Sequence, residues 1–284
     1  MARGLVLEGG AMRGIFTAGV IDVLMENNIS FDGMIGVSAG ACFGCNYVSN
    51  QPGRVIRYNL EYAQDDRYCS FKSWLKTGDM FGAQFCYHDL PEIYDLFDYD
   101  EFARSKMVFY VVATSVETGE AVYRKIDKDG DELLEWIRAS ASMPLFANIV
   151  EIDGGKFLDG GVADSIPVKV FTKLGYDTNV TVLTKPRGYR KSSNKMMPII
   201  RRKYKEYPEF IKAMENRHIA YNEQLRDVFE LEKAGKNFVI CPKSPLPIGH
   251  ICHDRLKIQE TYELGRLEAT EQLPALERFL ERSI

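Results

Sequence analysis

The stretch FDGMIGVSAGACFGCNYVS, residues 31–49, places Ser38 between Gly36 and Gly40 in a G-x-S-x-G pattern. The apolar residues before the serine are typical of a short buried strand, and the small and apolar residues after it favour a packed helix. A serine between a strand and a helix, flanked by glycines, is typical of a nucleophile elbow that presents the hydroxyl at the apex of a tight turn. Ordinary turns also carry this pattern, so the pattern alone does not establish a nucleophile. Other parts of the chain must supply the remaining groups of an active site.

The segments on either side of this stretch predict an α/β fold. Residues 3–10, RGLVLEGG, indicate a buried strand that ends in glycines, and residues 12–28 carry apolar side chains near helical spacing. Strand, helix, strand and helix within fifty residues predict a parallel sheet covered by helices. Short helices are expected over residues 54–105. Later segments predict a strand pair, two further strands and a final helix interrupted at Pro274: residues 106–124, 179–185, 237–242 and 261–282.

Composition narrows the class of protein. The 284 residues are 45% hydrophobic and 27% charged with a formal charge of −4, which predicts a soluble globular protein and gives no reason to expect a nucleic-acid partner. The first ten residues fit neither a secretory signal nor a membrane span, so a cytoplasmic location is expected. The six cysteines form no paired framework, which favours reduced thiols. Cys42 and Cys45 are interpreted as buried small residues rather than as a metal or redox pair.

A glycine-rich turn, GGAMRG at residues 9–14, follows the first predicted strand. Glycines between a strand and a helix expose backbone N–H groups at the positive end of the helix, where they can bind a phosphate or a transient oxyanion. The nucleotide-binding patterns G-x-G-x-x-G with an acidic partner and G-x-x-x-x-G-K-[ST] are not met. Because loops that follow neighbouring parallel strands open on the same sheet edge, this turn is expected to lie near Ser38.

A serine nucleophile needs a base, and the chain has four histidines. His88 and His218 lie in segments typical of a solvated surface. His250 and His253 in IGHICHD could complete a Ser-Asp-His order or bind a metal, although an elbow that follows a single βα unit argues against that triad. The other candidate base is Asp159 in FLDGGV, where glycines let a carboxylate approach another loop closely.

These three features, in this order, resemble the patatin-like phospholipase family, whose signatures are G-G-G-x-K/R-G, G-x-S-x-G and D-G-A/G. The small-residue and proline block ASASMPLF at residues 139–146 also looks like that family. The resemblance implies a three-layer α/β/α fold with a mainly parallel sheet, and lipid acyl hydrolysis without a metal or other cofactor. It assigns Ser38 as nucleophile and Asp159 as base. It assigns the oxyanion hole to Gly9, Gly10 and Ala11, with Arg13 stabilising the loop. The motif glycines that it implies are Gly14, Gly36, Gly40, Gly160 and Gly161.

One position departs from the family pattern. Ala11 replaces the usual third glycine, and we expect its methyl group to be tolerated only if its φ is negative. The resemblance covers residues 4–172 as a catalytic core. Residues 173–284 are expected to form a C-terminal extension that packs on this core and is not an independent domain.

The extension contains a strongly basic segment, residues 185–205, with nine lysines or arginines and no acid. The segment is either a solvated face or a contact for an anionic membrane surface. In the second case its apolar contacts would be Met196, Met197, Ile199 and Ile200.

The sequence therefore predicts a serine acyl hydrolase that acts on phospholipids, lysophospholipids or other acyl esters. Two alternatives stay open. One is a protein of the same fold that binds a lipid or an anion without turnover. The other is an esterase with a Ser-Asp-His triad that uses His250 or His253.

Overall fold

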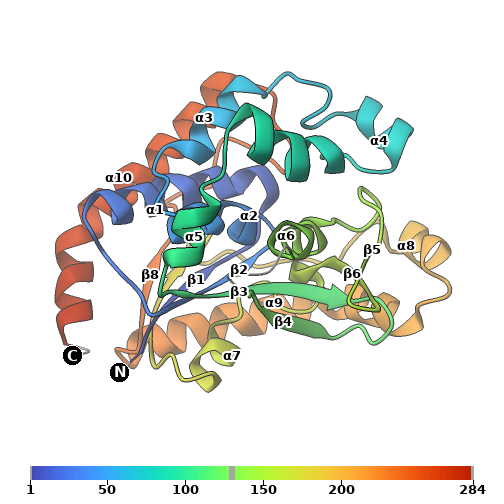
Figure 1. The fold of residues 1–284 in the computed structure, drawn as a ribbon. Helices are drawn as coiled ribbons and strands as arrows, with labels where there is room; N and C mark the ends of the chain where they lie inside the picture. The colour runs from blue at the N-terminus through green and yellow to red at the C-terminus, as the bar shows by residue number, and fades with distance from the viewer. Residues whose placement is uncertain (1, 128–131, 283–284) are drawn as a thin grey trace.

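The computed structural model describes residues 2–127 and 132–282, and its centre is an eight-stranded sheet (Figure 1). Hydrogen-bonded neighbours follow the order β5-β6-β3-β2-β1-β7-β8, and β4 pairs with β3. The strands are β1 (Arg3–Leu7), β2 (Gly33–Val37), β3 (Val108–Ser115), β4 (Ala121–Lys125), β5 (Val150–Ile152), β6 (Gly155–Asp159), β7 (Thr178–Val182) and β8 (Asn237–Ile240).

The pairing of β3 brings two distant segments together. Strands β8, β7, β1, β2 and β3 are parallel to their neighbours, whereas β4 and β6 pair with β3 in the antiparallel sense. Strand β2 pairs with β3 up to the residue pair Val37↔Val112. Strand β6 pairs with the next residues of β3, beginning at Asp159↔Ala113. Since β4 pairs with the other edge of β3 along the same residues, β2 and β6 meet end to end on one edge. Their last residues therefore lie side by side.

Helices cover both faces of the sheet, as the alternation of side chains along the strands requires. In β1, Leu5 and Leu7 pack with α1, α2 and α10, whereas Val6 packs with α7 and α9 on the opposite face. Figure 1 shows α1, α2 and α10 above the sheet and α7 and α9 below it. The predicted three-layer α/β/α fold with a mainly parallel sheet is thus confirmed. The helices are α1 (Ile15–Glu26), α2 (Ala39–Val48), α3 (Arg54–Glu61), α4 (Phe71–Thr77), α5 (Tyr99–Arg104), α6 (Leu133–Ala141), α7 (Val168–Lys173), α8 (Met197–Lys203), α9 (Pro208–Lys233) and α10 (Arg255–Glu281), with the short helical turns η1 (Ala11–Gly14) and η3 (Gly160–Val162).

The segment between α2 and β3 consists of short helices, as expected, and one of them is a π-helix, η2 (Phe85–Tyr94). The expected interruption at Pro274 is wrong, because α10 continues through this residue. Proline removes a hydrogen bond to the carbonyl four residues earlier, here that of Thr270. Both residues are exposed, so water can solvate that carbonyl and the helix tolerates the proline.

The C-terminal third contributes to the same layers as the rest of the chain. Strands β7 and β8 extend the sheet beyond β1, and α10 packs along α1. Our expectation that residues 173–284 do not fold apart from residues 4–172 stays a prediction, which separate expression of the two parts would test.

Candidate active site

Ser38 is the only residue between β2 and α2, and its backbone is strained. Its φ of 53° and ψ of −122° lie outside the regions that non-glycine residues ordinarily adopt. The turn is tight enough that a Cβ atom on Gly40 would lie 2.4 Å from the carbonyl oxygen of Leu7. Strain of this kind persists only where the surrounding structure enforces it, and it is concentrated at functional sites.

The hydroxyl of Ser38 donates a hydrogen bond of 2.7 Å to Oδ2 of Asp159. Both side chains are 5% exposed. This proximity follows from the sheet, because β2 and β6 end at adjacent positions on the same edge of β3. The other carboxylate oxygen, Oδ1, accepts a 2.8 Å hydrogen bond from the amide of Gly161, so one oxygen is held while the other faces the serine.

Ser140, which we did not predict as a site residue, fixes the elbow. Its Oγ accepts a 2.8 Å hydrogen bond from the amide of Ser38 and donates one of 2.5 Å to the carbonyl of Val112. The side chain is fully buried. Ser140 therefore connects α6 to the elbow and to β3. In the sequence, the one feature that could have indicated this role is a small hydroxyl residue within ASASMP.

Burial raises the pKa of Asp159 above that of an ordinary carboxyl group, because water is withdrawn from its charged form. The positive charges of Arg217 and Lys191 and the hydrogen bonds from Ser38 and Gly161 act in the opposite direction. The result is a carboxylate that binds a proton more readily than one in water, as a base for an alcohol requires.

The glycine-rich turn lies directly beside Ser38, since a Cβ atom on Gly9 would be 3.0 Å from that of Ser38. Within residues 2–127 and 132–282, the N–H groups of Gly9, Gly10 and Ala11 have no hydrogen-bond acceptor. They are free to donate to a ligand. The expectation that Ala11 has a negative φ is wrong, because its φ is 48°. The left-handed conformation costs a non-glycine residue about 1 kcal/mol, a cost that the fold must offset elsewhere, and Ala11 is partly exposed.

Arg13 connects this turn to the C-terminal third of the chain. Its Nη2 lies 3.2 Å from Nε2 of His250, and the amide of Met12 donates to the carbonyl of the same histidine. An arginine is always a donor, so Nε2 of His250 is the acceptor and the ring is neutral. Desolvation and the neighbouring cations lower the pKa of His250 to about 4, in agreement with this arrangement.

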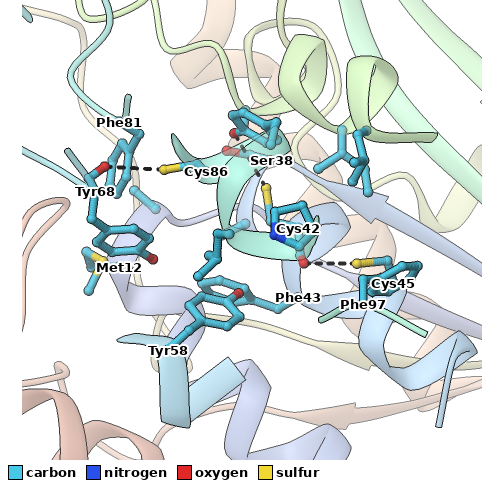
Figure 2. Close-up of a pocket in the computed structure, with 18 of the residues that line it drawn as sticks. Met12, Ser38, Cys42, Phe43, Cys45, Tyr58, Tyr68, Phe81, Cys86 and Phe97 are labelled. Atoms are coloured by element: carbon cyan, nitrogen blue, oxygen red, sulfur yellow. Dashed lines mark hydrogen bonds between the residues drawn. The ribbon is translucent and has the colours of Figure 1, made fainter. Parts of the chain in front are cut away.

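Two cavities meet at Ser38. The first is an apolar pocket of about 860 Å³ (Figure 2), and we call it the apolar pocket. Its walls come from α2, α3, η2, α6 and the loops between them, with Cys42, Phe43 and Tyr58 among the side chains that face inward. The pocket has the apolar lining of sites that bind small hydrophobic ligands.

The second cavity, about 1640 Å³ and open to solvent, we call the basic cleft. It contains Ser38, Asp159 and the glycine-rich turn on one side. On the other side it is lined by segments around Lys185, Lys191 and Arg217. These cationic residues were not predicted as site residues.

The remaining candidate residues lie elsewhere or have other partners. Among the described residues, Ser38 Oγ hydrogen-bonds to Asp159 alone, although His250 lines the basic cleft. The Nδ1 atom of His253 lies 2.7 Å from the carbonyl of Ala63. In the part of the chain that the structure describes, no three histidine, cysteine or acidic side chains are grouped to hold a metal ion.

The basic segment, residues 185–205, is divided between different environments. Lys185 and Lys191 line the basic cleft, whereas Arg201, Arg202, Lys203 and Lys205 are exposed on or beside α8. The predicted set of apolar membrane contacts is half wrong. Met197 and Ile200 are buried against Tyr204, Phe210 and Met214, because α8 needs an inner face, and only Met196 and Ile199 are exposed.

The three-layer α/β/α fold thus brings the elbow at Ser38, the buried Asp159 and the glycine-rich turn together in one site. A model of the patatin-like phospholipase family matches residues 5–172, which is more than half of the chain. The chain belongs to the patatin-like phospholipase family. A second model, of a domain of unknown function (DUF6363), matches residues 207–281.

Several relatives show partial similarity. The chain is 32% identical to the uncharacterized protein YjjU of Escherichia coli over 187 residues, covering 64% of this chain and 52% of YjjU. It is 26% identical to the lysophospholipase nte1 of Emericella nidulans over 212 residues, covering 71% of this chain and 13% of nte1. The chain thus matches about half of the first relative and a small part of the second. The solved structure of VipD from Legionella pneumophila superposes with a TM-score of 0.47 at 14% identity, covering 96% of this chain and 67% of VipD.

None of the described helices combines the length and the apolar content that crossing a bilayer requires.

Proposed function

We propose that the protein is a serine acyl hydrolase that cleaves carboxylic esters of lipids with a Ser38–Asp159 dyad. The observation that carries the proposal is the 2.7 Å hydrogen bond from Ser38 Oγ to a buried aspartate whose other oxygen is already held. The family of the chain and the lysophospholipase name of one relative support a lipid ester as substrate.

In the first step, Oγ of Ser38 attacks the ester carbonyl carbon while its proton passes to Oδ2 of Asp159. The carbonyl oxygen becomes an oxyanion. The N–H groups of Gly9, Gly10 and Ala11, which have no acceptor among the described residues, stabilise that charge in this proposal. When the carbon–oxygen bond to the leaving alcohol breaks, Asp159 returns the proton to the alcohol. An acyl group then remains on Ser38.

In the second step, a water molecule transfers a proton to Asp159 and attacks the acyl carbon. The oxyanion forms again beside the glycine-rich turn, and its collapse releases the fatty acid as Ser38 recovers the proton. The protons of both steps balance with the ester, one water molecule and the Ser38–Asp159 pair. The apolar pocket beside Ser38 has the lining to hold the acyl chain throughout.

A fluorophosphonate probe tests the nucleophile directly, because it phosphonylates only activated serines. We expect one adduct, mapped by peptide mass spectrometry to residue 38, and none in the Asp159→Asn variant. An adduct on another serine, or no adduct with the folded protein, would contradict the proposal and favour a binding protein without turnover.

The basic segment also supports a peripheral contact with an anionic membrane surface from a cytoplasmic location. Arg201, Arg202, Lys203 and Lys205 are exposed together on or beside α8, next to the exposed Ile199. Each charge near an anionic surface contributes about 1 kcal/mol, and salt screens the attraction. We expect the four-fold glutamine variant to sediment less with anionic liposomes at low salt while it hydrolyses a soluble ester normally. Equal sedimentation of variant and wild type would reduce the segment to a solvated face.

A further inference from the structure

Four cationic side chains converge on the basic cleft next to Ser38. Arg13 comes from the glycine-rich turn, Lys185 and Lys191 from the loop after β7, and Arg217 from α9. Two carboxyl groups, Glu8 and Asp159, line the same cavity. Three of the four cations therefore lie outside residues 5–172, the part that the family model matches.

None of these four side chains takes part in an ion pair within the described residues. Other cations of the same basic segment do, since Arg187 pairs with Glu232 at 2.5 Å and Arg201 with Glu215 at 2.7 Å. The Nζ atoms of the two lysines instead lie over aromatic rings, that of Lys185 at 4.8 Å from the ring of Tyr189 and that of Lys191 at 4.5 Å from the ring of Tyr221. Nε of Arg13 is buried and has no hydrogen-bond partner in the described part of the chain.

The two carboxyl groups offset only part of the charge of the four cations. Glu8 accepts hydrogen bonds from the hydroxyl of Tyr221 at 2.6 Å and from the amide and hydroxyl of Thr184 at 2.5 and 3.1 Å. Burial raises the pKa of Glu8, and the hydrogen bonds from Tyr221 and Thr184 and the charge of Arg13 act in the opposite direction. Asp159 is engaged with Ser38 and Gly161. The cleft thus has an excess of positive charge and no carboxylate left to pair with a ligand cation.

Burial is the main cause that lowers the pKa of Lys191 to about 8, repulsion from Arg217 and Arg13 acts in the same direction, and Glu8 acts against it. Burial also lowers the pKa values of Lys185 and Arg13, with repulsion from a neighbouring arginine as a further cause and Glu8 opposing the shift. A bound anion would relieve this repulsion, because it supplies the negative charge that the cleft lacks.

We propose that the basic cleft binds the phosphate of the substrate headgroup, with Lys185, Lys191 and Arg217 as the residues that select anionic over zwitterionic headgroups. The inference rests on the proposed ester hydrolysis at Ser38 and names the substrate class of that site. A guanidinium fork and ammonium groups suit phosphate oxygens. With the acyl chain in the apolar pocket, the headgroup of a glycerophospholipid extends into the cleft on the other side of Ser38. A choline or ethanolamine cation would meet four positive charges there and no free carboxylate.

The test compares three soluble substrates with the same hexanoyl chain: lysophosphatidate, lysophosphatidylcholine and monohexanoylglycerol. We expect wild type to favour lysophosphatidate over lysophosphatidylcholine by about 10-fold or more in kcat/KM, as one or two charge-assisted contacts can provide. The variant Lys185→Gln with Lys191→Gln should lose about 10-fold on lysophosphatidate and stay within two-fold on monohexanoylglycerol, both measured on the plateau of the pH profile, where Asp159 stays ionised although it has lost the charge of Lys191. The matched control is Arg190→Gln with Lys195→Gln, which removes two exposed charges of the same segment outside the cleft and should change neither value. Equal losses on both substrates, an equal loss in the control, or no preference of wild type for lysophosphatidate would overturn the proposal.

Inorganic phosphate and glycerol 3-phosphate distinguish a headgroup site from a site for a free anion. In a headgroup site both compete with lysophosphatidate, raising KM and leaving kcat unchanged, and both inhibit the lysine variant less. Inhibition that lowers kcat alone would place the anion elsewhere and contradict the proposal.

A binding measurement separates this proposal from the proposed hydrolysis. The Ser38→Ala protein should bind hexanoyl lysophosphatidate in calorimetry, and the two lysine substitutions in that background should weaken binding about 10-fold. If the Ser38→Ala protein still hydrolyses esters, the proposed nucleophile is wrong while the binding result stands. If it binds the ligand equally well with and without the lysines, the headgroup site is wrong while the nucleophile stands.

Discussion

The apolar pocket and the basic cleft share Ser38, and they are built from different parts of the chain. The residues that line the apolar pocket all lie between Ala11 and Met143. The basic cleft combines the glycine-rich turn and Asp159 with side chains from residues 185–251. The apolar side is therefore wholly a product of the patatin-like region, whereas the charged side needs the C-terminal third.

This difference separates two kinds of recognition. Apolar surface in a pocket holds a chain by its length and shape, and it is tolerant of chemical detail. Fixed charges in a cleft respond to the sign and position of a ligand charge. One half of the molecule can thus set the acyl preference while the other sets the headgroup preference, with the ester at the boundary between them.

The largest effect should come from Ser38→Ala, which removes the atom at that boundary and leaves both cavities in place. We expect kcat for a short-chain ester to fall by about 10⁴-fold or more, since the nucleophile is lost. Circular dichroism and thermal unfolding should show an intact fold, because alanine fits the elbow. Substantial turnover by this variant would show that Ser38 is not the nucleophile and that hydrolysis does not take place between the two cavities.

Asp159→Asn should lower kcat by about 10²–10⁴-fold, because the amide preserves the shape of the side chain and cannot accept the proton. Since the ionised form is the base and its pKa is raised by burial, wild-type kcat/KM should increase with pH through an inflection above the ordinary aspartate pKa and then level off. A pH profile of wild type, followed by single-pH assays of the variant, checks both. A flat acid limb or near-normal activity of the variant would remove Asp159 as the base.

Cys42→Phe should fill the apolar pocket and leave the basic cleft unchanged. Cys42 lies one turn after Ser38 on α2 and faces the pocket (Figure 2). We expect kcat/KM for a dodecanoyl ester to fall by about 10-fold and that for an acetyl ester by less than three-fold, consistent with the loss of several buried methylene groups. Cys42→Ser, which nearly preserves the volume, is the matched control. A uniform loss on both esters would indicate a damaged elbow rather than a shortened pocket.

His250→Ala should have the smallest effect, with kcat within about three-fold of wild type. The imidazole accepts from Arg13 and makes no hydrogen bond to Ser38 in the described structure, so it is not placed as a base. His253→Ala is expected to behave in the same way. A fall of kcat by about 10²-fold or more in either variant would restore the Ser-Asp-His triad as the better mechanism.

The sequence predicted the parts of the site that depend on local backbone shape. Ser38, Asp159 and the glycine-rich turn occur in short motifs because tight turns and close backbone approaches restrict which residues fit. Lys191 and Arg217 occur in a loop and in a charged helix, where a residue that faces a cleft looks like any solvated cation. Only the packing of α9 and of the loop after β7 against the sheet brings them to Ser38.

The same distinction explains the errors. The positive φ of Ala11 and the buried side of α8 depend on contacts with distant segments, which a local pattern does not contain. Proline usually interrupts a helix. Pro274 does not interrupt α10, because it is exposed and water can solvate the carbonyl that loses its hydrogen bond.

The end-to-end meeting of β2 and β6 on β3 also bears on how this protein can move. Val37, next to Ser38, pairs with Val112, and Asp159 pairs with the adjacent Ala113 of the same central strand, so we expect thermal motion to displace Ser38 and Asp159 together. Amides of β3 should accordingly exchange with deuterium only in the rarest openings of the sheet. Entry of a lipid must instead depend on the peripheral walls, the π-helix η2 on one side and the loop after β7 on the other. Their amides should exchange early, and under the proposed function we expect the opening of these walls, rather than motion of Ser38 and Asp159, to limit the rate of turnover.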